Sequence, residues 1–360
     1  MVGTPASKVG EPYSATLLSS AAAIRSLADR AKPLLEQHRT WHPDFFLASV
    51  SERHWKARAV SVTCNDDLVG IMYVKERLFL GCPTGIVYTD ATLGMNIVAE
   101  PVHRQQTFSV AVRSLLTSGR ARALRLVVPI DVFDSHTISS IAASADMEMV
   151  SFQVENHSRL ALPSSYDDFL NGLGARTRRN FRYYRRRFEA TGGCYEGRMP
   201  FERFCSAAWH LRGKSAIGAD ESAIKRVLTM LSAISEPILV GLRAPTGEWL
   251  SVAGGWCDGG RATLLFQMNN DQEYYRDSVS QVLRSYLIED LIPRGIRDLV
   301  FWAGTSAPLA RYAKAIPATA LYLDSRSPGW RLIRRVVSST AFRLPKRWRE
   351  LGHWIKPAQR

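Results

Sequence analysis

The sequence predicts an α/β protein built from two tandem domains, each a mixed, mostly antiparallel sheet flanked by helices, with a basic helical tail at the C-terminus. Two observations carry this prediction. The second half runs from several short apolar segments through one long amphipathic helix to a further apolar segment, and the first half repeats that order. A length of 360 residues also favours two domains of ordinary size.

Three strands joined by tight turns are predicted at the start of the second-half repeat. The apolar runs are Pro237–Leu242, Trp249–Cys257 and Ala262–Asn269, and the turns between them are Ala244-Pro245-Thr246-Gly247 and Asp258-Gly259-Gly260. Turn residues between β-prone apolar runs are typical of an antiparallel meander.

One long helix and a buried strand follow the meander. Asp277 or Ser278 can cap the helix, and Pro293-Arg294-Gly295 ends it. Its apolar positions recur at helical spacing and are Val279, Val282, Leu283, Tyr286, Leu287 and Leu291. The next run, Asp298–Trp302, is short and apolar, as expected for a strand that is buried on both faces.

The first half contains the same order of elements. They are a hairpin of Ala57–Cys64 and Leu68–Val74, the apolar runs Arg77–Leu80 and Ile86–Tyr88, a helix over Gln105–Ser118 and a strand over Ala123–Val128. Gly119 and Gly295 end the two helices, and their positions differ by 295 − 119 = 176 residues. Two copies of one fold is the simplest explanation, and chance similarity between two ordinary strand-helix-strand units is the alternative.

A polar joint, Leu162–Phe169, lies between the two copies. Polar and turn-forming segments are usual at domain boundaries. We therefore expect an N-terminal helical or irregular segment over residues 1–40, a first domain over 41–160, a second domain over 161–324 and a basic amphipathic tail over 325–360.

The formal net charge of +14 is concentrated in two segments, of which the first is Arg176–Arg187. This segment holds seven arginines and no acid. Phe181, Tyr184 and Phe188 recur at helical spacing, so the segment is predicted to dock as a helix with its guanidinium groups outward. Such a helix favours a polyanionic partner, with CoA phosphates, a nucleotide- or polyprenyl-linked sugar, or RNA as candidates, and a solvated cationic face is the alternative.

The C-terminal tail is the second basic segment. Residues 326–360 hold ten Lys and Arg against the single acid Glu350. Apolar residues alternate with these charges and are Trp330, Ile333, Val337, Leu344, Trp348, Leu351, Trp354 and Ile355. This composition suits a helix that lies on an anionic membrane surface, and packing of a basic helix on the protein is an equal alternative.

Four pieces of the chain together resemble the GNAT-superfamily acyltransferases of the CelD-like type, relatives of the FemABX peptidyltransferases. They are Tyr166–Leu170 leading into the arginine-rich segment, the segment Trp209–Ser215, the meander with its helix, and the strand that ends before Gly304. The resemblance covers Leu160–Asp324 and implies two tandem GNAT-like domains. It also implies acyl-CoA as co-substrate, no metal, and an amine or hydroxyl acceptor such as a cell-envelope or exopolysaccharide precursor.

The resemblance further implies the residues of the site. Backbone groups of Gln267, Met268 and Asn269 would bind the pantetheine arm, and Arg276, Ser278, Val279 and Ser280 would bind the phosphates at a helix N-terminus. Glu273 would act as base and Tyr275, next to Tyr274, as acid or hydrogen-bond donor. Candidate substrate-binding residues are Arg179, Arg182, Arg186, Trp209, Arg212 and Trp302. Family members often have glycine where this chain has Val279, whose side chain is expected to hinder close approach of a pyrophosphate.

Other function classes compete with this acyltransferase hypothesis. One is a FemABX-like transferase that uses aminoacyl-tRNA, and another is a non-catalytic protein on a GNAT scaffold that binds nucleic acid or a membrane. The sequence has no P-loop and no Gly-x-Ser-x-Gly motif, so neither nucleotide hydrolysis nor serine esterase chemistry is expected.

The sequence also predicts the cellular setting. We find no signal peptide or membrane span, so we expect a cytoplasmic protein, with peripheral attachment to the inner face of the membrane as a further option. The five cysteines are widely spaced, which argues against a disulfide framework and a structural zinc, and we expect them to be buried thiols.

Overall fold

The computed structural model describes residues 12–36, 42–50, 54–89, 97–215, 220–302, 304, 305 and 307–340, without the side chains of residues 156, 275 and 336–340. The chain forms two compact units. Unit 1 comprises Met1–Leu34, Glu52–Val154 and Ala318–Arg360, and unit 2 comprises Leu35–Ser51 and Glu155–Pro317. The predicted domain limits at residues 40, 160 and 324 stay predictions.

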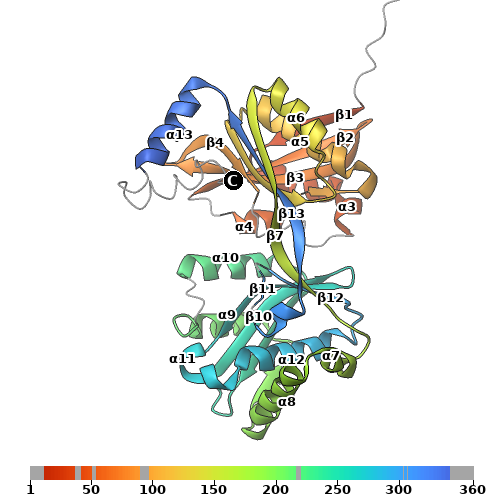
Figure 1. The fold of residues 1–360 in the computed structure, drawn as a ribbon, viewed down its shortest axis with the longest axis vertical. Coiled ribbons are helices and arrows are strands. Elements are labelled where there is room, and N and C mark those ends of the chain that lie inside the picture. Colours follow the sequence, from red (N-terminus) through yellow and green to blue (C-terminus); the bar gives the residue numbers. More distant parts are fainter. Residues whose placement is uncertain are drawn as a thin grey trace, which may run out of the picture. The chain divides into compact units, whose positions relative to one another are not determined.

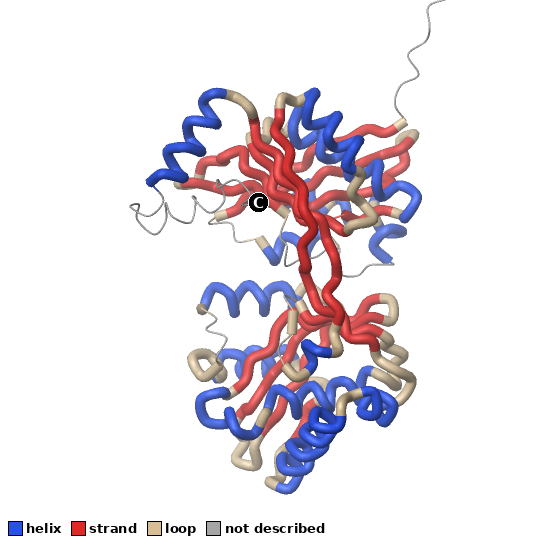
Figure 2. The backbone as a smooth tube through the Cα atoms, viewed as in Figure 1, coloured by secondary structure: helices blue, strands red, loops and turns tan. Residues whose placement is uncertain are grey.

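Unit 1 is a mixed sheet with helices packed on it (Figures 1 and 2). The strand order is β1-β2-β3-β4-β6-β13-β7, and β5 pairs with β3. The strands are β1 (Tyr13–Leu18), β2 (Trp55–Cys64), β3 (Asp67–Phe79), β4 (Cys82–Tyr88), β5 (Ile97–Ala99), β6 (Ala123–Pro129), β7 (Met147–Ala161) and β13 (Lys314–Ser325). The helices are α1 (Ala21–Arg25), α2 (Leu27–Arg30), α3 (Lys32–Glu36), η3 (Pro101–His103), α5 (Arg104–Thr117), α6 (Ser135–Ser144) and α13 (Pro328–Thr340).

In unit 2 the same hydrogen-bonded strand order continues as β7-β12-β11-β10-β9-β8. Its own strands are β8 (Cys194–Glu196), β9 (Pro237–Arg243), β10 (Trp249–Asp258), β11 (Arg261–Asn269) and β12 (Asp298–Phe301). Its helices are α4 (Pro43–Ser49), α7 (Tyr166–Gly172), α8 (Ala175–Ala190), α9 (Phe201–His210), α10 (Glu221–Ser232), α11 (Asp271–Tyr274), η4 (Tyr275–Asp277), α12 (Val279–Leu291) and η5 (Leu309–Arg311). Because β7 and β13 each have residues in both units, the chain passes between the units along strands.

The strand and helix predictions for the second half are confirmed. The meander is β9-β10-β11, Gly247, Gly259 and Gly260 lie in turns with positive φ, and α12 ends before Gly295, whose φ is +78°. β11 and β12 pair in parallel, as expected for a meander, helix and buried strand in this order.

The repeat in the first half is also confirmed, because β2-β3-β4-α5-β6 has the order of β9-β10-β11-α12-β12 and β4 pairs with β6 in parallel. The runs predicted over Leu68–Val74 and Arg77–Leu80 are one strand, β3.

Helices α12 and α9 cover opposite faces of the unit 2 sheet. Gln267 of β11 bonds to Ser280 of α12, whereas the ring of its neighbour Phe266 lies 6.4 Å from that of Phe204 in α9. Successive side chains of a strand point to opposite faces, so the two contacts mark the two sides of the sheet.

The arginine-rich helix α8 docks as predicted. Phe181 and Phe188 are buried in the unit 2 core, and Tyr184 packs against it. Full burial of such an aromatic side chain contributes about 1.5–3 kcal/mol, so the stripe holds the helix on the unit.

The described part of the tail packs on unit 1 in α13. Trp330 is only 4% exposed, and its indole N–H donates to Oδ1 of Asp324 at 3.2 Å. Leu332 and Ile333 of the same helix are exposed. Residues 341–360, which carry the rest of the predicted amphipathic tail, lie outside the described residues.

The prediction of buried cysteines is wrong. Cys82 and Cys194 are exposed, Cys64, Cys205 and Cys257 are half-buried, and all five are free thiols. Within the described ranges of the chain, no helix has both the length and the apolar character needed to cross a membrane.

Candidate functional site

Strands β11 and β12 diverge in unit 2. They pair in parallel from Arg261 with Asp298 to Leu264 with Phe301, and the Trp302 N–H donates to the Leu264 carbonyl at 3.0 Å. β11 then continues to Asn269, and within the described residues it has no further partner on this side. The register with β10 shifts at the same point, and a bulge of this kind bends a strand. We call the opening beyond Leu264 the splay.

Two of the predicted backbone groups face the splay. The Asn270 N–H donates to the Leu250 carbonyl at 2.8 Å, toward β10. Backbone groups alternate in direction along a strand, so those of Met268 also point to β10 and those of Gln267 and Asn269 point to the splay. A ligand chain that enters the splay therefore finds its peptide partners at Gln267 and Asn269.

The N-terminus of α12 is open. Ser278 is the N-cap residue, as predicted, but it has left-handed backbone angles (φ 48°, ψ 42°) and its side chain forms no capping bond. The first bonds within the helix run from Gln281 and Val282 to the Ser278 carbonyl. The N–H groups of Val279 and Ser280 precede them and point out of the helix end, where the dipole favours an anion.

Val279 does not stand in the way of an anion at this helix end. Its side chain is 3% exposed and belongs to the hydrophobic core of unit 2. The expected obstruction of a pyrophosphate is therefore absent, because the side chain points inward.

A polar network links the splay to α12. The Gln267 amide donates to Oγ of Ser280 at 3.0 Å and to Oδ1 of Asn269 at 3.1 Å, and Ser251 donates to the same oxygen at 2.7 Å. Arg284, one turn after Ser280, donates from Nε to Oε1 of Gln267 at 2.9 Å. The side chains of Gln267, Asn269 and Ser280, predicted for their backbone alone, thus lie together.

Arg284 was missed by the sequence analysis. Its Nη1 donates to Oγ1 of Thr305 at 3.0 Å, so the guanidinium reaches both sides of the splay. Burial lowers its pKa to about 10. The available signal is a cation among the apolar positions of α12, four residues after Ser280 and so on the same helix face.

The predicted catalytic residues lie just beyond the end of β11. Glu273 accepts from Lys214 at 3.2 Å and from Asn270 at 3.2 Å. Lys214 also donates to Glu248 at 2.8 Å, and this bond raises the pKa of Lys214. Burial raises the pKa of Tyr274, whose hydroxyl donates to Glu248. Tyr275 lies in η4, and its side chain is outside what the structure describes.

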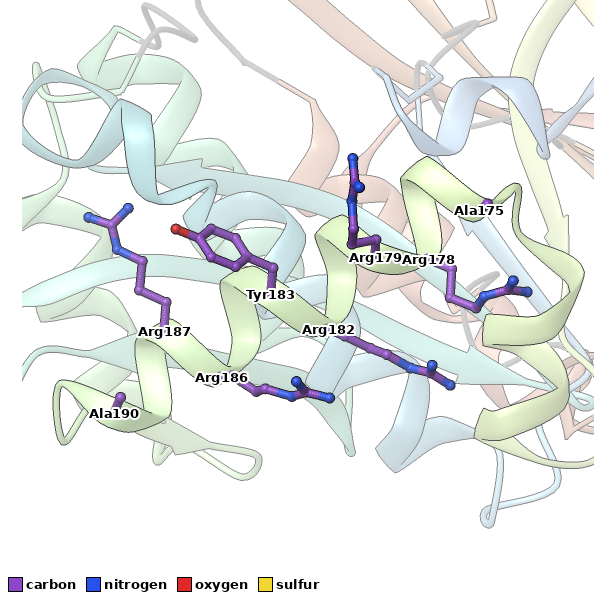
Figure 3. Close-up of a pocket in the computed structure, with 8 residues that line it drawn as sticks. All are labelled: Ala175, Arg178, Arg179, Arg182, Tyr183, Arg186, Arg187 and Ala190. Carbon is purple, nitrogen blue, oxygen red and sulfur yellow. The ribbon is translucent and has the colours of Figure 1, made fainter.

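Figure 3 shows five arginines of α8, with Arg178, Arg182 and Arg186 on one side of the helix and Arg179 and Arg187 on the other. They border a groove of about 540 Å³ that is lined by Ala175, Arg178, Arg179, Arg182, Tyr183, Arg186, Arg187 and Ala190. Arg179, Arg182 and Arg186 are exposed and form no ion pair with any residue that the structure describes. We call these three residues the arginine stripe.

Two other arginines of this helix are paired with acids, which corrects the expectation of a helix without acids nearby. Arg185 pairs with Glu189 at 3.0 Å and with Glu289 at 2.7 Å. Arg187 pairs with Asp277 at 2.8 Å. Arg176 and Arg178 form no ion pair with a described residue either, so five of the seven arginines of α8 keep an unpaired charge.

The remaining predicted residues form two separate aromatic groups. The guanidinium of Arg212 lies 5.7 Å above the Trp209 ring and pairs with Glu221 at 3.3 Å. Trp302, at the end of β12, packs against Trp256 with 5.4 Å between ring centres and against His157 at 5.0 Å. Neither group is joined to the Gln267 network by a described hydrogen bond.

The equivalent position in unit 1 is closed. Thr89 follows β4, and its N–H donates to the Arg125 carbonyl of β6 at 3.1 Å. Its hydroxyl then bonds to both the N–H and the carbonyl of Val127, at 2.7 and 3.3 Å. The fully buried Thr89 therefore continues the ladder where β11 and β12 separate in unit 2.

Comparison with known families identifies a domain within unit 2. Residues 175–312 match the acetyltransferase (GNAT) domain family. Unit 2 carries a GNAT domain. The matched residues include α8, the meander, α12 and β12, and therefore the splay and the open helix N-terminus.

Solved structures show that the likeness extends over both units. FemX is similar with a TM-score of 0.58 and 12% identity, over 80% of this chain and 93% of that chain. The C-terminal domain of a putative lysylphosphatidylglycerol synthetase from Agrobacterium fabrum is similar with a TM-score of 0.52 and 13% identity, over 89% of this chain and 97% of that chain. A conserved protein of unknown function from Bacteroides thetaiotaomicron reaches a TM-score of 0.53 at 9% identity, over 87% and 100%.

At these identities the structures share a fold with this chain. The chain therefore has a tandem GNAT-like fold that it shares with FemX. A search of curated protein sequences finds no match.

Proposed function

We propose that the GNAT domain transfers an acyl group from acyl-CoA to an amine or hydroxyl acceptor. The observation that carries this proposal is the splay, which the Gln267–Ser280 hydrogen bond links to the first turn of α12, where the helix N-terminus has no side-chain cap. Unit 1 has the same order of elements, but Thr89 closes its equivalent position. We therefore assign the reaction to unit 2 alone.

The residues present fit acyl-CoA. The N–H groups of Val279 and Ser280, together with exposed Arg276, suit its phosphates. The backbone groups of Gln267 and Asn269 suit the amides of its pantetheine arm. When bound, acyl-CoA supplies an activated acyl group as a thioester, and the chain's own groups hold it, exclude water and handle the acceptor proton.

An acceptor must lose a proton when it attacks a thioester. We propose that Glu273 takes this proton and that Tyr275 is the hydrogen-bond donor. Lys214 and Asn270 support Glu273 in this role, because both donate hydrogen bonds that hold its carboxylate in place.

We propose an anionic acceptor of the kind found in cell-envelope or exopolysaccharide precursors. The arginine stripe supports this part of the proposal, since Arg179, Arg182 and Arg186 are exposed cations beside a groove. Guanidinium groups bind phosphate oxygens through paired hydrogen bonds. Trp209, Arg212 and Trp302 stay candidate acceptor contacts.

Thermal unfolding with acetyl-CoA and free CoA tests the donor site. A ligand at 100 times its Kd adds about 2.7 kcal/mol of stability, which raises the melting temperature by roughly 5–10 °C for a unit of this size. A Ser278→Glu/Ser280→Glu variant places two carboxylates at the helix end and should lose the shift. The matched control is Ser139→Glu/Ser140→Glu on exposed positions of α6, which should keep it. A wild-type protein that binds neither CoA nor acetyl-CoA would sink the proposal.

A second candidate is a transferase that uses aminoacyl-tRNA as donor. The unpaired arginine stripe favours it, because phosphate backbones bind such surfaces. Bulk tRNA should then bind with an affinity that falls steeply as the salt concentration rises. Addition of CoA should change neither the stability of the protein nor its affinity for tRNA. For the third hypothesis, a non-catalytic binding protein, the feature most in favour is Val279 in place of glycine, and the Val279 side chain is buried in the core.

A further inference from the structure

Arg284 is a partly buried cation without an acid. Its two hydrogen-bond partners, Gln267 and Thr305, are neutral, and no described residue forms a salt bridge with it. Other arginines held within the fold differ in this respect. Arg125 pairs with Asp324 at 2.8 Å, and Arg185 has two glutamates.

The guanidinium retains free donors at the splay. A guanidinium has five N–H groups in one plane, and two of them are used here, on Nε and on Nη1. Both N–H groups of Nη2 and one of Nη1 have no acceptor in the described part of the chain. The Phe301 ring, 5.1 Å from the guanidinium carbon, covers one side of the group.

The positive charge of Arg284 is not needed to link Gln267 on β11 to Thr305 after β12. A neutral amide would serve Gln267 and Thr305 equally well, whereas a cation removed from water is costly unless an anion accompanies it. Burial lowers the pKa of Arg284 to about 10, so the group is still charged at neutral pH. A partly buried cation that two neutral groups hold in position, with free donors toward the splay, is a preformed anion site.

The CoA phosphates are not the anion in question. The proposed function assigns them to the amides of Val279 and Ser280, and Arg284 lies one turn further into α12, about 6 Å along the helix axis. Acyl-CoA carries no charge between its phosphates and its acyl group. The anion at Arg284 must therefore come from the acyl group or from the acceptor.

We propose that Arg284 binds a carboxylate of the substrate within the splay. The carboxylate belongs either to a dicarboxylic acyl group on the donor or to an amino-acid-type acceptor. Its two oxygens match the planar pair of free N–H groups on Nη1 and Nη2, which a rigid fork recognises better than a point charge does. This inference rests on the proposed acyl transfer and makes its substrate class specific.

The first arm of the test compares succinyl-CoA with butyryl-CoA, which have acyl chains of equal carbon number with and without a carboxylate. Affinities are measured by calorimetry for wild type and Arg284→Met. The second arm supplies acetyl-CoA with the common amino acids or with their amides, and follows loss of the thioester absorbance. Arg226→Met, an exposed arginine of α10, is the control for the lost charge.

In one of the two arms, wild type and Arg226→Met should prefer the compound with the carboxylate at least tenfold. The preference is in affinity for succinyl-CoA over butyryl-CoA, or in rate with amino acids over their amides. Arg284→Met should lose that preference to within twofold while it still binds butyryl-CoA like wild type. Arg284→Lys keeps the charge but not the fork, so it should give an intermediate preference, and it carries the test if the methionine variant does not fold. A preference absent from both arms, or one that Arg284→Met retains, would overturn the inference.

The two proposals fail separately. If wild type binds no acyl-CoA, the proposed acyl transfer fails. Free succinate against succinamide, titrated into wild type and Arg284→Met, then decides the carboxylate site by itself. Tighter binding of succinate that the variant loses supports the site, and equal binding rejects it.

Discussion

Arg187 of α8 forms an ion pair with Asp277, the residue before Ser278, with 2.8 Å between Nη2 and Oδ1. The pair joins the helix that carries the arginine stripe to the open N-terminus of α12. It also places a carboxylate of the protein beside the position proposed for the CoA phosphates. Asp277 therefore attracts Arg187 and opposes a bound phosphate at the same time.

Replacing Asp277 with asparagine should strengthen CoA binding. The change removes the nearby carboxylate and frees Arg187 for phosphate, so we expect CoA to bind about three- to tenfold more tightly, a gain of roughly 0.7–1.4 kcal/mol. Loss of a half-exposed pair should cost at most about 1 kcal/mol of stability. Calorimetric titration with CoA measures the first effect and urea unfolding the second. Weaker CoA binding by Asp277→Asn would contradict this placement of the phosphates.

Restoring the family's glycine at Val279 should not improve CoA binding. Because the Val279 side chain is buried in the core, Val279→Gly leaves a cavity and a flexible first turn, and we expect a loss of about 2–3 kcal/mol in the free energy of unfolding. Ser278→Gly is the matched control. Its backbone already has φ of 48°, so glycine there should stabilise the protein by about 1 kcal/mol. Thermal and urea unfolding of both variants, with and without CoA, compare the two positions.

Removing the arginine stripe should weaken polyanion binding without unfolding the protein. Arg179, Arg182 and Arg186 are exposed, so their triple replacement by alanine should change stability by less than about 1 kcal/mol in total. If tRNA binds, the slope of log affinity against log salt should fall by about 2, since each phosphate contact to a single strand contributes about 0.7. Filter binding at several salt concentrations measures the slope, and an unchanged slope would place the contacts elsewhere.

Stability of unit 2 should depend on acid pH through Glu189. The hydrogen bond from Tyr286, together with Arg185, holds the pKa of Glu189 below its ordinary value of 4.5. A carboxyl group with a lowered pKa in the folded state contributes stability that is complete above the unfolded value and is lost as pH falls through the folded one. The free energy of unfolding should therefore fall below about pH 4.5.

A Glu189→Gln variant should show a smaller fall over the same pH range. Urea unfolding between pH 3 and pH 7 measures it for wild type and variant. Glu155→Gln, at an exposed glutamate, should behave like wild type. Equal acid dependence in wild type and Glu189→Gln would show that the Glu189 carboxylate is not held by its neighbours.

Much of the fold of each unit could be predicted because its signals are local. Turn residues such as Gly259 and Gly260 mark the meander, and a 3.6-residue period marks α12 and the docking face of α8. The order of these elements then predicts the tandem GNAT fold, since a parallel strand after a crossover helix has few ways to pair.

The ion pairs of the α8 arginines could not be predicted from the local sequence. The composition of the segment counts seven arginines and no acid, but acids from other elements reach Arg185 and Arg187 in space. The stripe Arg179, Arg182 and Arg186 could be named from the sequence, and only the fold shows that acids of the described residues pair with Arg185 and Arg187 and not with these three.

The sequence by itself determined the element order and the tandem repeat, because periodicity and turn chemistry depend on neighbours along the chain. Only the tertiary structure decided that Val279 points into the core, that Thr89 closes the matching position in unit 1, and that Arg284 meets Gln267 and Thr305. These outcomes depend on a strand bulge and on contacts between segments that are far apart in the sequence. A local sequence pattern does not specify which distant residue a side chain will contact.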